Sequence, residues 1–356
     1  MKIEVHVLTR LDGHSIPDDK REVRLFATVR NELARLPHLL DYYRSIGVGR
    51  FFIVDNDSTD KTIEFLLEQP DCHVFHTRNR FAPGKADWQN SLLDGYGTGH
   101  WTLVVDADEL FVFPHCEKIG IRAFCDFLDA EGSEAVASFL LDMYGEGGLD
   151  RAVYTPGQPF LEVCPYFDGD YGFMDRPALP FAKAPFPPQE PVGGPRLRMF
   201  YPEWNRRTTW MQWKKRLAAQ LAKHLPKIGL GNLRTHLQGP PILYKVPLVK
   251  WKKGYVSTLH TLCAAVKLSA VTSAILHFKF FSDFHEKATV AATRGQHFGG
   301  GVEYKKYLHS FNKNPDNVFV YDGSVKYGST QDLLDHRLVT SVPSYEAHVA
   351  SLTAPA

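Results

Sequence analysis

Short apolar segments alternate with segments of helical periodicity over the first 140 residues. The segments rich in β-forming residues are RLFATVR, RFFIVDN, CHVFHT, WTLVVDAD and EAVASFLL, at 24–30, 50–56, 72–77, 101–108 and 134–141. Apolar residues three and four apart predict helices between them, in 36–48, 55–70, 85–97 and 119–132. Strands separated by helices of this length are typical of an α/β protein, with a Rossmann-like, mostly parallel sheet flanked by helices.

Turn-forming residues mark the ends of two of these helices. Gly47 is a candidate C-cap of the first helix, because glycine adopts the left-handed backbone there at little cost. Ser58 and Thr59 precede the second helix, and their hydroxyls are candidate N-caps.

The regular alternation ends near residue 145. Seven prolines between Pro177 and Pro195 argue against a regular helix or a central strand in that stretch. Residues 283–312 have the pattern of polar helices, and the chain after Leu338 lacks strong periodicity, so we expect it to lie on the surface or fray. The predicted organisation is a core at 1–145, a region at 146–282 that partly completes it, and C-terminal helices with a tail at 283–356.

Charge is distributed unevenly along the 356 residues. The net charge is +1, but residues 204–282 contain fourteen Lys and Arg and no Asp or Glu, so the remainder carries −13. A basic insert on an acidic body suggests an anionic partner such as a nucleotide, a phospholipid headgroup or a phosphorylated glycan; a solvated basic surface is the simpler alternative. No nucleic-acid-reading motif accompanies the charge, so we do not expect nucleic acid as a partner.

The basic insert also contains an amphipathic pattern. In WNRRTTWMQWKKRLAAQLAKHLPKI, residues 204–228, tryptophans and cations accompany leucines four residues apart. This composition is typical of a helix lying on an anionic membrane, although a helix packed on its own domain has the same pattern. No apolar run spans a membrane, no signal-peptide core is present, and the five cysteines form no C-x-x-C pair. We therefore expect a cytoplasmic protein, with possible peripheral contact at the inner face of the membrane.

Acidic side chains follow several of the predicted strands. The strand ends read Arg30-Asn31-Glu32, Asp55-Asn56-Asp57-Ser58 and Asp106-Ala107-Asp108-Glu109. Because ligands of such sheets bind beyond the carboxyl ends of the strands, these residues are the first candidates for a site. On an extended backbone Asp106 and Asp108 would project from one face and repel each other, unless a cation lies between them or one takes up a proton. Hard oxygen ligands of this kind suit Mg²⁺ or Mn²⁺, with substrate phosphates completing the shell.

These motifs resemble a known enzyme family. VRNELARLPHLLDYYRSIGVGRFFIVDNDSTDKTIEFL and WTLVVDADELFVFP resemble the family 2-type glycosyltransferases of GT-A fold, in the bacterial branch with an R-N-E strand end and a D-x-D-E motif. The resemblance is dense over about 22–115. It returns more loosely in GPRLRMF, YKVPLVKW and ILHFKFFSDFHEKA, at 194–200, 244–251 and 275–288.

The resemblance implies a nucleotide-sugar donor, a divalent metal, and roles for matching residues. It implies nucleoside contacts for Arg30, Asn31, Glu32, Asp55 and Asp57. It implies that Asp106 and Asp108 hold ribose and Mn²⁺ or Mg²⁺. His277, an imidazole within an apolar segment, would be the late metal ligand or a phosphate contact, although a hydrogen-bonded core histidine is the alternative. The Pro- and aromatic-rich region would form the acceptor side.

Two further roles are open from the residues alone. Lys85 could neutralise a phosphate, or it could be an ordinary surface lysine. An inverting transfer needs a carboxylate base, for which Asp142 and then Glu146 are candidates, with Asp168 as another possibility; a retaining mechanism needs no such base.

The expected function is metal-dependent transfer of a sugar, most simply from a UDP-sugar, to a glycan or lipid-linked acceptor in bacterial surface polysaccharide synthesis. Two alternatives stay open: another nucleotide-sugar enzyme, and a non-catalytic protein that binds polyanions or glycans on the same scaffold. The first alternative would usually show a glycine-rich phosphate loop, and RNELARLP has no glycine.

Overall fold

A computed structural model describes residues 8–79, 81–175, 187, 189–201, 242–258, 260–294, 302–313 and 318–354. The predicted amphipathic segment 204–228 and most of the proline-rich stretch lie outside these ranges.

Within the described residues the strands form one large sheet and two small ones. The large sheet contains β1 Thr9–Arg10, β2 Val23–Val29, β3 Val48–Asp55, β4 Cys72–His76, β5 Trp101–Val104, β6 Glu109–Val112, β7 Ala135–Asp142, β11 Tyr244–Lys250 and β12 Ser273–His277. The small sheets pair β8 Tyr166–Asp168 with β13 Ser324–Lys326, and β9 Gly172–Asp175 with β10 Gln189–Val192.

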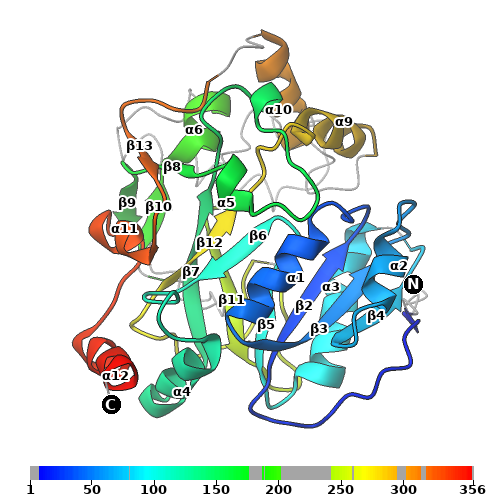
Figure 1. Ribbon diagram of the computed structural model, residues 1–356, viewed down its shortest axis with the longest axis vertical. Helices are drawn as coiled ribbons and strands as arrows, with labels where there is room; N and C mark the ends of the chain where they lie inside the picture. The colour runs from blue at the N-terminus through cyan, green and yellow to red at the C-terminus, as the bar shows by residue number, and fades with distance from the viewer. Residues whose placement is uncertain are drawn as a thin grey trace, which may run out of the picture.

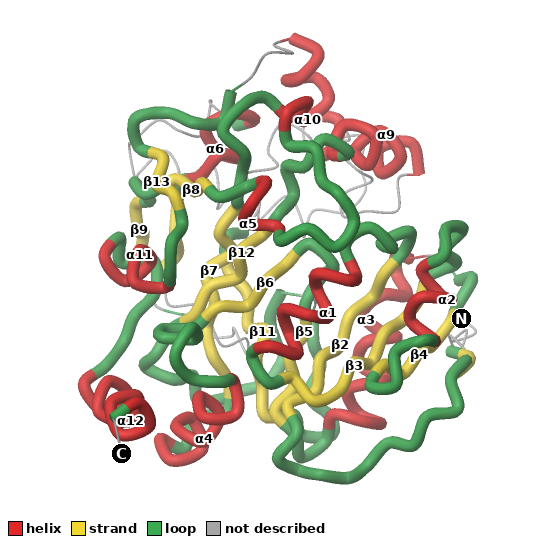
Figure 2. The backbone as a smooth tube through the Cα atoms, in the orientation of Figure 1, coloured by secondary structure: helices red, strands yellow, loops and turns green. Residues whose placement is uncertain are grey.

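The described helices cover or extend this sheet (Figures 1 and 2). They are α1 Leu36–Ser45, α2 Thr62–Leu67, α3 Phe81–Leu92 with its π-helical continuation Leu93–Gly97, α4 Ile121–Glu131, α5 Phe160–Val163, α6 Gly194–Phe200, α9 Phe284–Arg294, α10 Val302–Lys313, α11 Thr330–Asp335 and α12 Pro343–Thr353, with a 3₁₀ turn at Leu149–Arg151. The five strands and four helices predicted in the first 140 residues are therefore confirmed. Gly47, with φ of 97°, follows α1 as expected.

The large sheet is mixed, with most of its strands in one direction. Its order is β1-β4-β3-β2-β5-β11-β7-β12-β6. The pairings make β4, β3, β2, β5, β7 and β12 parallel to one another, whereas β1, β11 and β6 run the opposite way. This is the expected Rossmann-like α/β sheet. Two of its strands, β11 and β12, come from the chain after residue 240, which completes the core from a distance in sequence.

Helices cover both faces of the sheet because its strands are apolar on both sides. In β2, Leu25 and Ala27 pack in one cluster with the buried residues of α1 and α4, while Phe26 packs in another with Trp88 of α3. Successive strand residues point to opposite faces, so a strand buried on both faces is mostly apolar. The buried Arg24 of β2 is an exception, and its guanidinium donates to two backbone carbonyl oxygens. All seven residues of β2 are buried.

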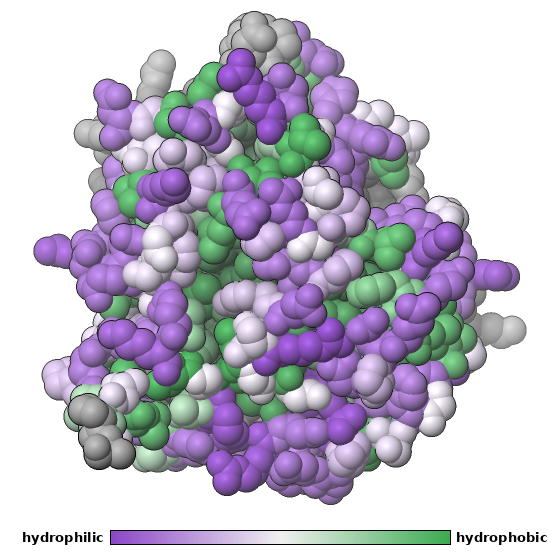
Figure 3. Space-filling view, in the orientation of Figure 1, coloured by the Kyte–Doolittle hydropathy of each residue, from purple (hydrophilic) through white to green (hydrophobic). Residues whose placement is uncertain are grey.

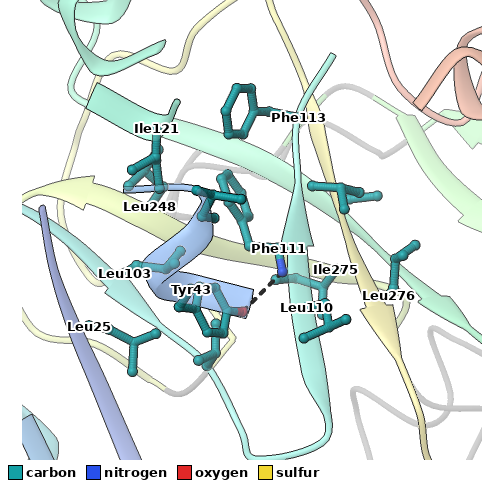
Figure 4. Packing of buried hydrophobic residues seen from close by; sticks show 14 of the residues in the cluster. Leu25, Tyr43, Leu103, Leu110, Phe111, Phe113, Ile121, Leu248, Ile275 and Leu276 are labelled. Carbon is teal, nitrogen blue, oxygen red and sulfur yellow. Dashed lines mark hydrogen bonds between the residues drawn. The ribbon is translucent and has the colours of Figure 1, made fainter. Parts of the chain in front are cut away.

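The sequence pattern did not distinguish β6 as a separate strand. It begins at Glu109, at the end of the acidic stretch that follows β5. It pairs antiparallel with β12. Tyr43 of α1 fixes its position: the Tyr43 hydroxyl donates to the carbonyl oxygen of Glu109 at 2.9 Å and accepts from the amide of Phe111 at 3.0 Å (Figure 4). The hydroxyl lies among Leu110, Ile275 and other core residues, so the start of β6 is held from within the core.

A second, smaller core lies beyond the sheet edge, toward the top of Figure 1. It joins α6, α9 and α10 through buried aromatic residues, among them Phe200, Phe284 and Tyr307. Of these helices, α9 and α10 fall within the stretch 283–312 that the sequence predicts to be helical, apart from the last residue of α10, and confirm that prediction. Figure 3 shows a largely hydrophilic surface on this side, with apolar side chains visible between the polar ones in the middle of the view.

Of the two expectations for the chain after Leu338, fraying is wrong, and the segment lies on the surface with most of its described residues exposed. Residues 343–353 form α12, and Tyr345 and Val349, four residues apart, are both buried. The ring of Tyr345 packs edge-on against Phe124 and Phe127 of α4, and its hydroxyl donates to the carbonyl of Pro114 at 2.7 Å. Two buried residues in eleven give too weak a period to be seen in the sequence, so the tertiary contact decides the structure.

Two further findings concern the described residues only: the lack of a membrane-spanning helix and the state of the cysteines. None of their helices is long and apolar enough to cross a membrane. The five cysteines, all described, are free thiols, as expected.

Replacing Tyr345 with Ala should lower the free energy of unfolding by about 3–5 kcal/mol, the usual cost of removing an aromatic side chain from a core. Leu352→Ala, on the same helix but 51% exposed, should change it by less than about 0.5 kcal/mol. Urea denaturation of the three proteins measures both values. Equal stabilities would show that α12 is not docked.

Candidate active site

The carboxyl ends of the parallel strands lie at one edge of the sheet and carry the predicted polar residues. Glu32 follows β2, Asp57 follows β3 and Asp108 follows β5, while Asp142 and His277 are the last residues of β7 and β12. Because β11 is antiparallel to its neighbours, its beginning also lies at this edge. Lys245, the second residue of β11, therefore joins the same rim.

The turns after β2 and β3 lock together. The amide of Asn31 donates to the hydroxyl oxygen of Ser58 at 2.9 Å, and the side-chain oxygen of Asn31 accepts from the amide of Thr59 at 2.7 Å. Asn31 and Asp57 have φ of 53° and 59°, a left-handed backbone that Asn and Asp tolerate better than most residues. The prediction that Ser58 or Thr59 caps α2 is wrong: Lys61 occupies the cap position without a side-chain bond, and the two residues hold Asn31 instead.

Arg30, Asp55 and Asp57 surround the second turn. The Arg30 guanidinium donates to the carbonyl of Asn56 at 2.7 Å and lies 3.9 Å from the Asp57 carboxylate, which is 43% exposed. Asp55 is fully buried and accepts from the amide of Ser58 at 3.1 Å. Asp55 thus shapes the turn from below, while Asp57 is open to solvent at the rim.

Glu32 belongs to a cluster of four charges that joins this rim to α9. Its carboxylate oxygens lie 2.8 and 2.9 Å from the ammonium of Lys287, and one of them accepts from Arg35 at 3.1 Å. Arg35, nearly buried, donates two bonds of 2.8 Å to Asp283. Both oxygens of Glu32 are therefore engaged within the protein.

Two lysines hold Asp106. Lys85 of α3 approaches one carboxylate oxygen to 2.5 Å, and Lys245 approaches the other to 3.4 Å while also bonding the buried carboxylate of Glu109. Burial alone would raise the pKa of Asp106, but the charges of Lys85 and Lys245 outweigh it and hold that pKa well below its ordinary value. At Glu109 burial prevails over Lys245, and the pKa of this carboxyl is raised.

The backbone through the D-x-D motif is not extended. β5 ends at Val104, and a turn closed by a 3.2 Å bond from the amide of Glu109 to the carbonyl of Asp106 follows. The expectation that Asp106 and Asp108 project from one face of a strand is therefore wrong. The turn sends Asp106 toward the two lysines and Asp108 toward β12, which separates the two like charges.

Asp108 faces His277. The distance from Asp108 Oδ2 to His277 Nε2 is 3.6 Å, and the amide of Phe278 donates to the carbonyl of Asp108 at 2.7 Å. Burial opposes ionisation of Asp108, but the charge of His277, with smaller contributions from Arg35 and Lys287, leaves its pKa below the ordinary value. The Asp108 side chain is 30% exposed, so the gap between the two groups is open to solvent.

Asp142 lies on the Nδ1 side of the His277 ring, whereas Asp108 lies on the Nε2 side. His277 Nδ1 is 2.7 Å from Asp142 Oδ1, and Arg196 Nε of α6 donates to Asp142 Oδ2 at 2.6 Å. Asp142 is fully buried; although burial raises its pKa, Arg196 and His277 prevail and lower it. Glu146, four residues further along, is exposed beyond the end of β7. The other candidate base, Asp168, is buried and bonded to Tyr144 and Arg198.

Sequence reasoning missed Lys245, Arg196 and Arg35 as parts of the rim. Lys245 did leave a signal, because a lone lysine at the second position of the apolar segment YKVPLVK must find a buried partner. Arg196 left none, since it directly follows the proline-rich stretch and pairs with Asp142, 54 positions away. Arg35 bonds Glu32 three positions away, but its pairing with Asp283 has no counterpart in the local pattern.

Comparisons with known proteins add little to this geometry. No protein-family model matches the chain, and no curated protein is similar to it. Among solved structures, the crystal structure of HddC from Yersinia pseudotuberculosis is similar at 14% identity over 38% of this chain and 70% of that one, with a TM-score of 0.26. A superposition this weak supports no argument about fold or function. In the described residues no group of three or more His, Cys, Asp or Glu is arranged to hold a metal.

The charge of Lys245 should be essential to stability. Lys245→Met leaves the buried carboxylate of Glu109 without its cation and removes one of the two lysines at Asp106, so the free energy of unfolding should fall by about 3–5 kcal/mol. Lys250→Met is the matched control: it lies on the same strand, is 40% exposed and pairs with Asp129, and should cost less than about 1 kcal/mol. Chemical denaturation at pH 7 measures both, and equal costs would contradict this account of the rim.

Proposed function

We propose that the protein is a metal-dependent glycosyltransferase of GT-A type, which moves a sugar from a nucleotide-diphospho-sugar, with UDP favoured, to a glycan or lipid-linked acceptor. The D-x-D motif, the strand-end residues and His277 supply the family resemblance. Their gathering at the carboxyl edge of a Rossmann-like sheet, where such sheets bind ligands, supports a common site. The two lysines at Asp106 provide positive charge beside it, as a diphosphate requires.

The observation that carries the proposal is the pair formed by Asp108 and His277. Asp142 accepts from Nδ1 of His277, so in a metal-bound state the lone pair of Nε2 would point toward a carboxylate oxygen 3.6 Å away. Two electron-rich atoms facing each other at this distance need a proton or a cation between them. The distance is less than twice a metal–ligand bond of about 2.1 Å, so one ion can contact both atoms.

The carboxylate of this donor set suits Mn²⁺ and Mg²⁺ alike. The imidazole favours Mn²⁺, because Mg²⁺ strongly prefers oxygen ligands. Asp108 and His277 would hold the ion from the protein side. When bound, it would neutralise charge on the donor's diphosphate as the leaving group departs.

The residues of the chain have separate tasks in this scheme. Arg30, Asn31 and Asp57 form the turns that would receive the nucleoside, and Glu32 and Asp55 hold those turns in place. Lys85 would exchange its bond with Asp106 for one with a phosphate oxygen. Of the three candidate bases, Asp142 is enclosed between His277 and Arg196, and Asp168 is buried. Glu146, exposed beyond β7, is therefore the proposed group that takes the proton from the acceptor hydroxyl.

Thermal unfolding with UDP, GDP, dTDP or CMP, each in the presence of Mn²⁺ or of EDTA, tests the proposal. A ligand at a hundred times its dissociation constant stabilises the fold by about 2.7 kcal/mol, which raises the melting temperature by several degrees. We expect one nucleotide to produce this shift with Mn²⁺ and to lose it with EDTA. Asp108→Ala should abolish the shift, and Asp41→Ala, an exposed position on α1, should keep it.

The same conditions also allow a test for the reaction itself. The nucleotide that stabilises the protein should, as its diphospho-sugar, be converted slowly to the free diphosphate in a Mn²⁺-dependent manner. A folded protein that responds to no nucleotide would contradict the transferase proposal and favour the non-catalytic binding protein. A shift that survives both EDTA and Asp108→Ala would contradict the metal role of the D-x-D motif.

A further inference from the structure

One buried group of charges at the rim lies outside the D-x-D motif itself. Asp142, at the end of β7, has no exposed surface and divides its two oxygens between His277 and Arg196, at 2.7 and 2.6 Å. Arg196 is 4% exposed and belongs to α6, and its guanidinium also lies 3.9 Å from Glu303 of α10. A continuous line of charged groups thus runs from α10 through α6 and β7 to the imidazole on β12.

Stability alone does not explain why this ion pair is buried. A buried ion pair does not generally stabilise a protein more than apolar residues of the same volume, because both charges lose their hydration. Its clear effect is to fix geometry: a carboxylate that accepts from Nδ1 sets both the tautomer and the rotation of the ring. The imidazole then presents Nε2 in one direction only, which is toward Asp108.

We propose that Asp142 and Arg196 are positioning residues that set the metal affinity of the site through His277. This inference rests on the proposed metal-dependent function. Arg196 holds the Asp142 carboxylate from the side away from the ring, so the carboxylate cannot rotate away from Nδ1. Asp142 touches neither donor nor acceptor, and its role differs from the general base that its place after a strand suggested.

The position of α6 makes the affinity depend on a distant part of the chain. α6 begins at Gly194, where φ is 83° and an added Cβ would lie 2.3 Å from the hydroxyl of Tyr171. Glycine is therefore required there, and it lets α6 approach closely enough for Arg196 to reach Asp142. Leu197 and Phe200 of the same helix pack in the core shared with α9 and α10. Displacement of these helices would release Arg196 and, with it, the imidazole.

The chain offers a matched control for this relay. Arg198, two residues further along α6, pairs with the buried Asp168 at 3.0 Å. This second Arg–Asp pair has the same chemistry and the same helix, but Asp168 bonds Tyr144 rather than His277. Asp142→Asn and Asp168→Asn should therefore both destabilise the fold, whereas only the former should change metal binding.

The test is a titration of Mn²⁺ alone, followed by the electron paramagnetic resonance signal of the free ion, on the full-length protein. Asp142→Asn should weaken Mn²⁺ binding about 10- to 100-fold, the usual effect of removing a carboxylate behind a ligating histidine. Arg196→Lys keeps the charge beside Asp142 but loses the fixed geometry of the guanidinium, and should weaken binding less. Asp168→Asn should bind Mn²⁺ as the unaltered protein does.

The outcomes separate this inference from the proposed function. If the unaltered protein binds Mn²⁺ and both Asp142→Asn and Arg196→Lys bind it equally well, the positioning role is wrong and the metal site stands. If Asp168→Asn weakens binding as much as Asp142→Asn, the effect is general loosening, and the inference is again overturned. If the unaltered protein binds no Mn²⁺, the proposed metal-dependent function is wrong, and the positioning role of Asp142 and Arg196 is wrong as well. Should Asp142→Asn not fold, Arg196→Lys decides the question.

Discussion

Repulsion between carboxylates at one edge of the sheet is the constraint on which the rest of the structure depends. Parallel strands bring their carboxyl ends together, and here several of those ends are acidic. Cations from other elements pair with these carboxylates and offset the repulsion: Lys85 from α3, Lys245 from β11, Arg196 from α6 and Lys287 from α9. For the buried pairs of Lys245 with Glu109 and of Arg196 with Asp142, removing either member costs more than the pair contributes, so β11 and α6 are tied to this edge of the sheet. The uneven charge of the sequence is partly balanced within the fold, because in the described residues Lys245, Lys250, Lys252 and Lys279 of the basic insert pair with acids outside it. Of these four, Lys245 lies at the acidic edge.

Asp108 differs from its neighbours in how it is balanced. In the described part of the chain its ion-pair partner is an imidazole at 3.6 Å, whereas Asp106 and Glu32 each lie within 3.4 Å of two full cations. The imidazole is itself backed by Asp142, so two carboxylates share one histidine. This is the place on the rim where an added cation would relieve repulsion without displacing an existing one. The proposed metal position therefore follows from the charge balance as well as from the motif.

The sequence predicted the local elements well and the long-range contacts poorly. The apolar strands and the helices between them follow from periodicity alone, and so does the position of acidic residues at strand ends. The neighbours of those acids do not, because Lys245 reaches Asp106 across 139 positions and Arg196 reaches Asp142 across 54. The docking of α12 depends on Tyr345 meeting α4, which no local pattern encodes. The turn that separates Asp106 from Asp108 is closed by the bond between the Glu109 amide and the Asp106 carbonyl, and Tyr43 anchors the strand that follows it from the core.

The most direct measurement is the anomalous scattering of Mn²⁺ in crystals grown with the nucleoside diphosphate that stabilises the protein most. The account predicts a single strong anomalous peak between Asp108 and His277, within about 2.2 Å of one oxygen and one nitrogen, with the diphosphate on its open side and the nucleoside at the turns after β2 and β3. A nucleotide bound on another face, or Mn²⁺ bound away from both Asp108 and His277, would contradict the claim that this rim is a metal-dependent nucleotide-sugar site.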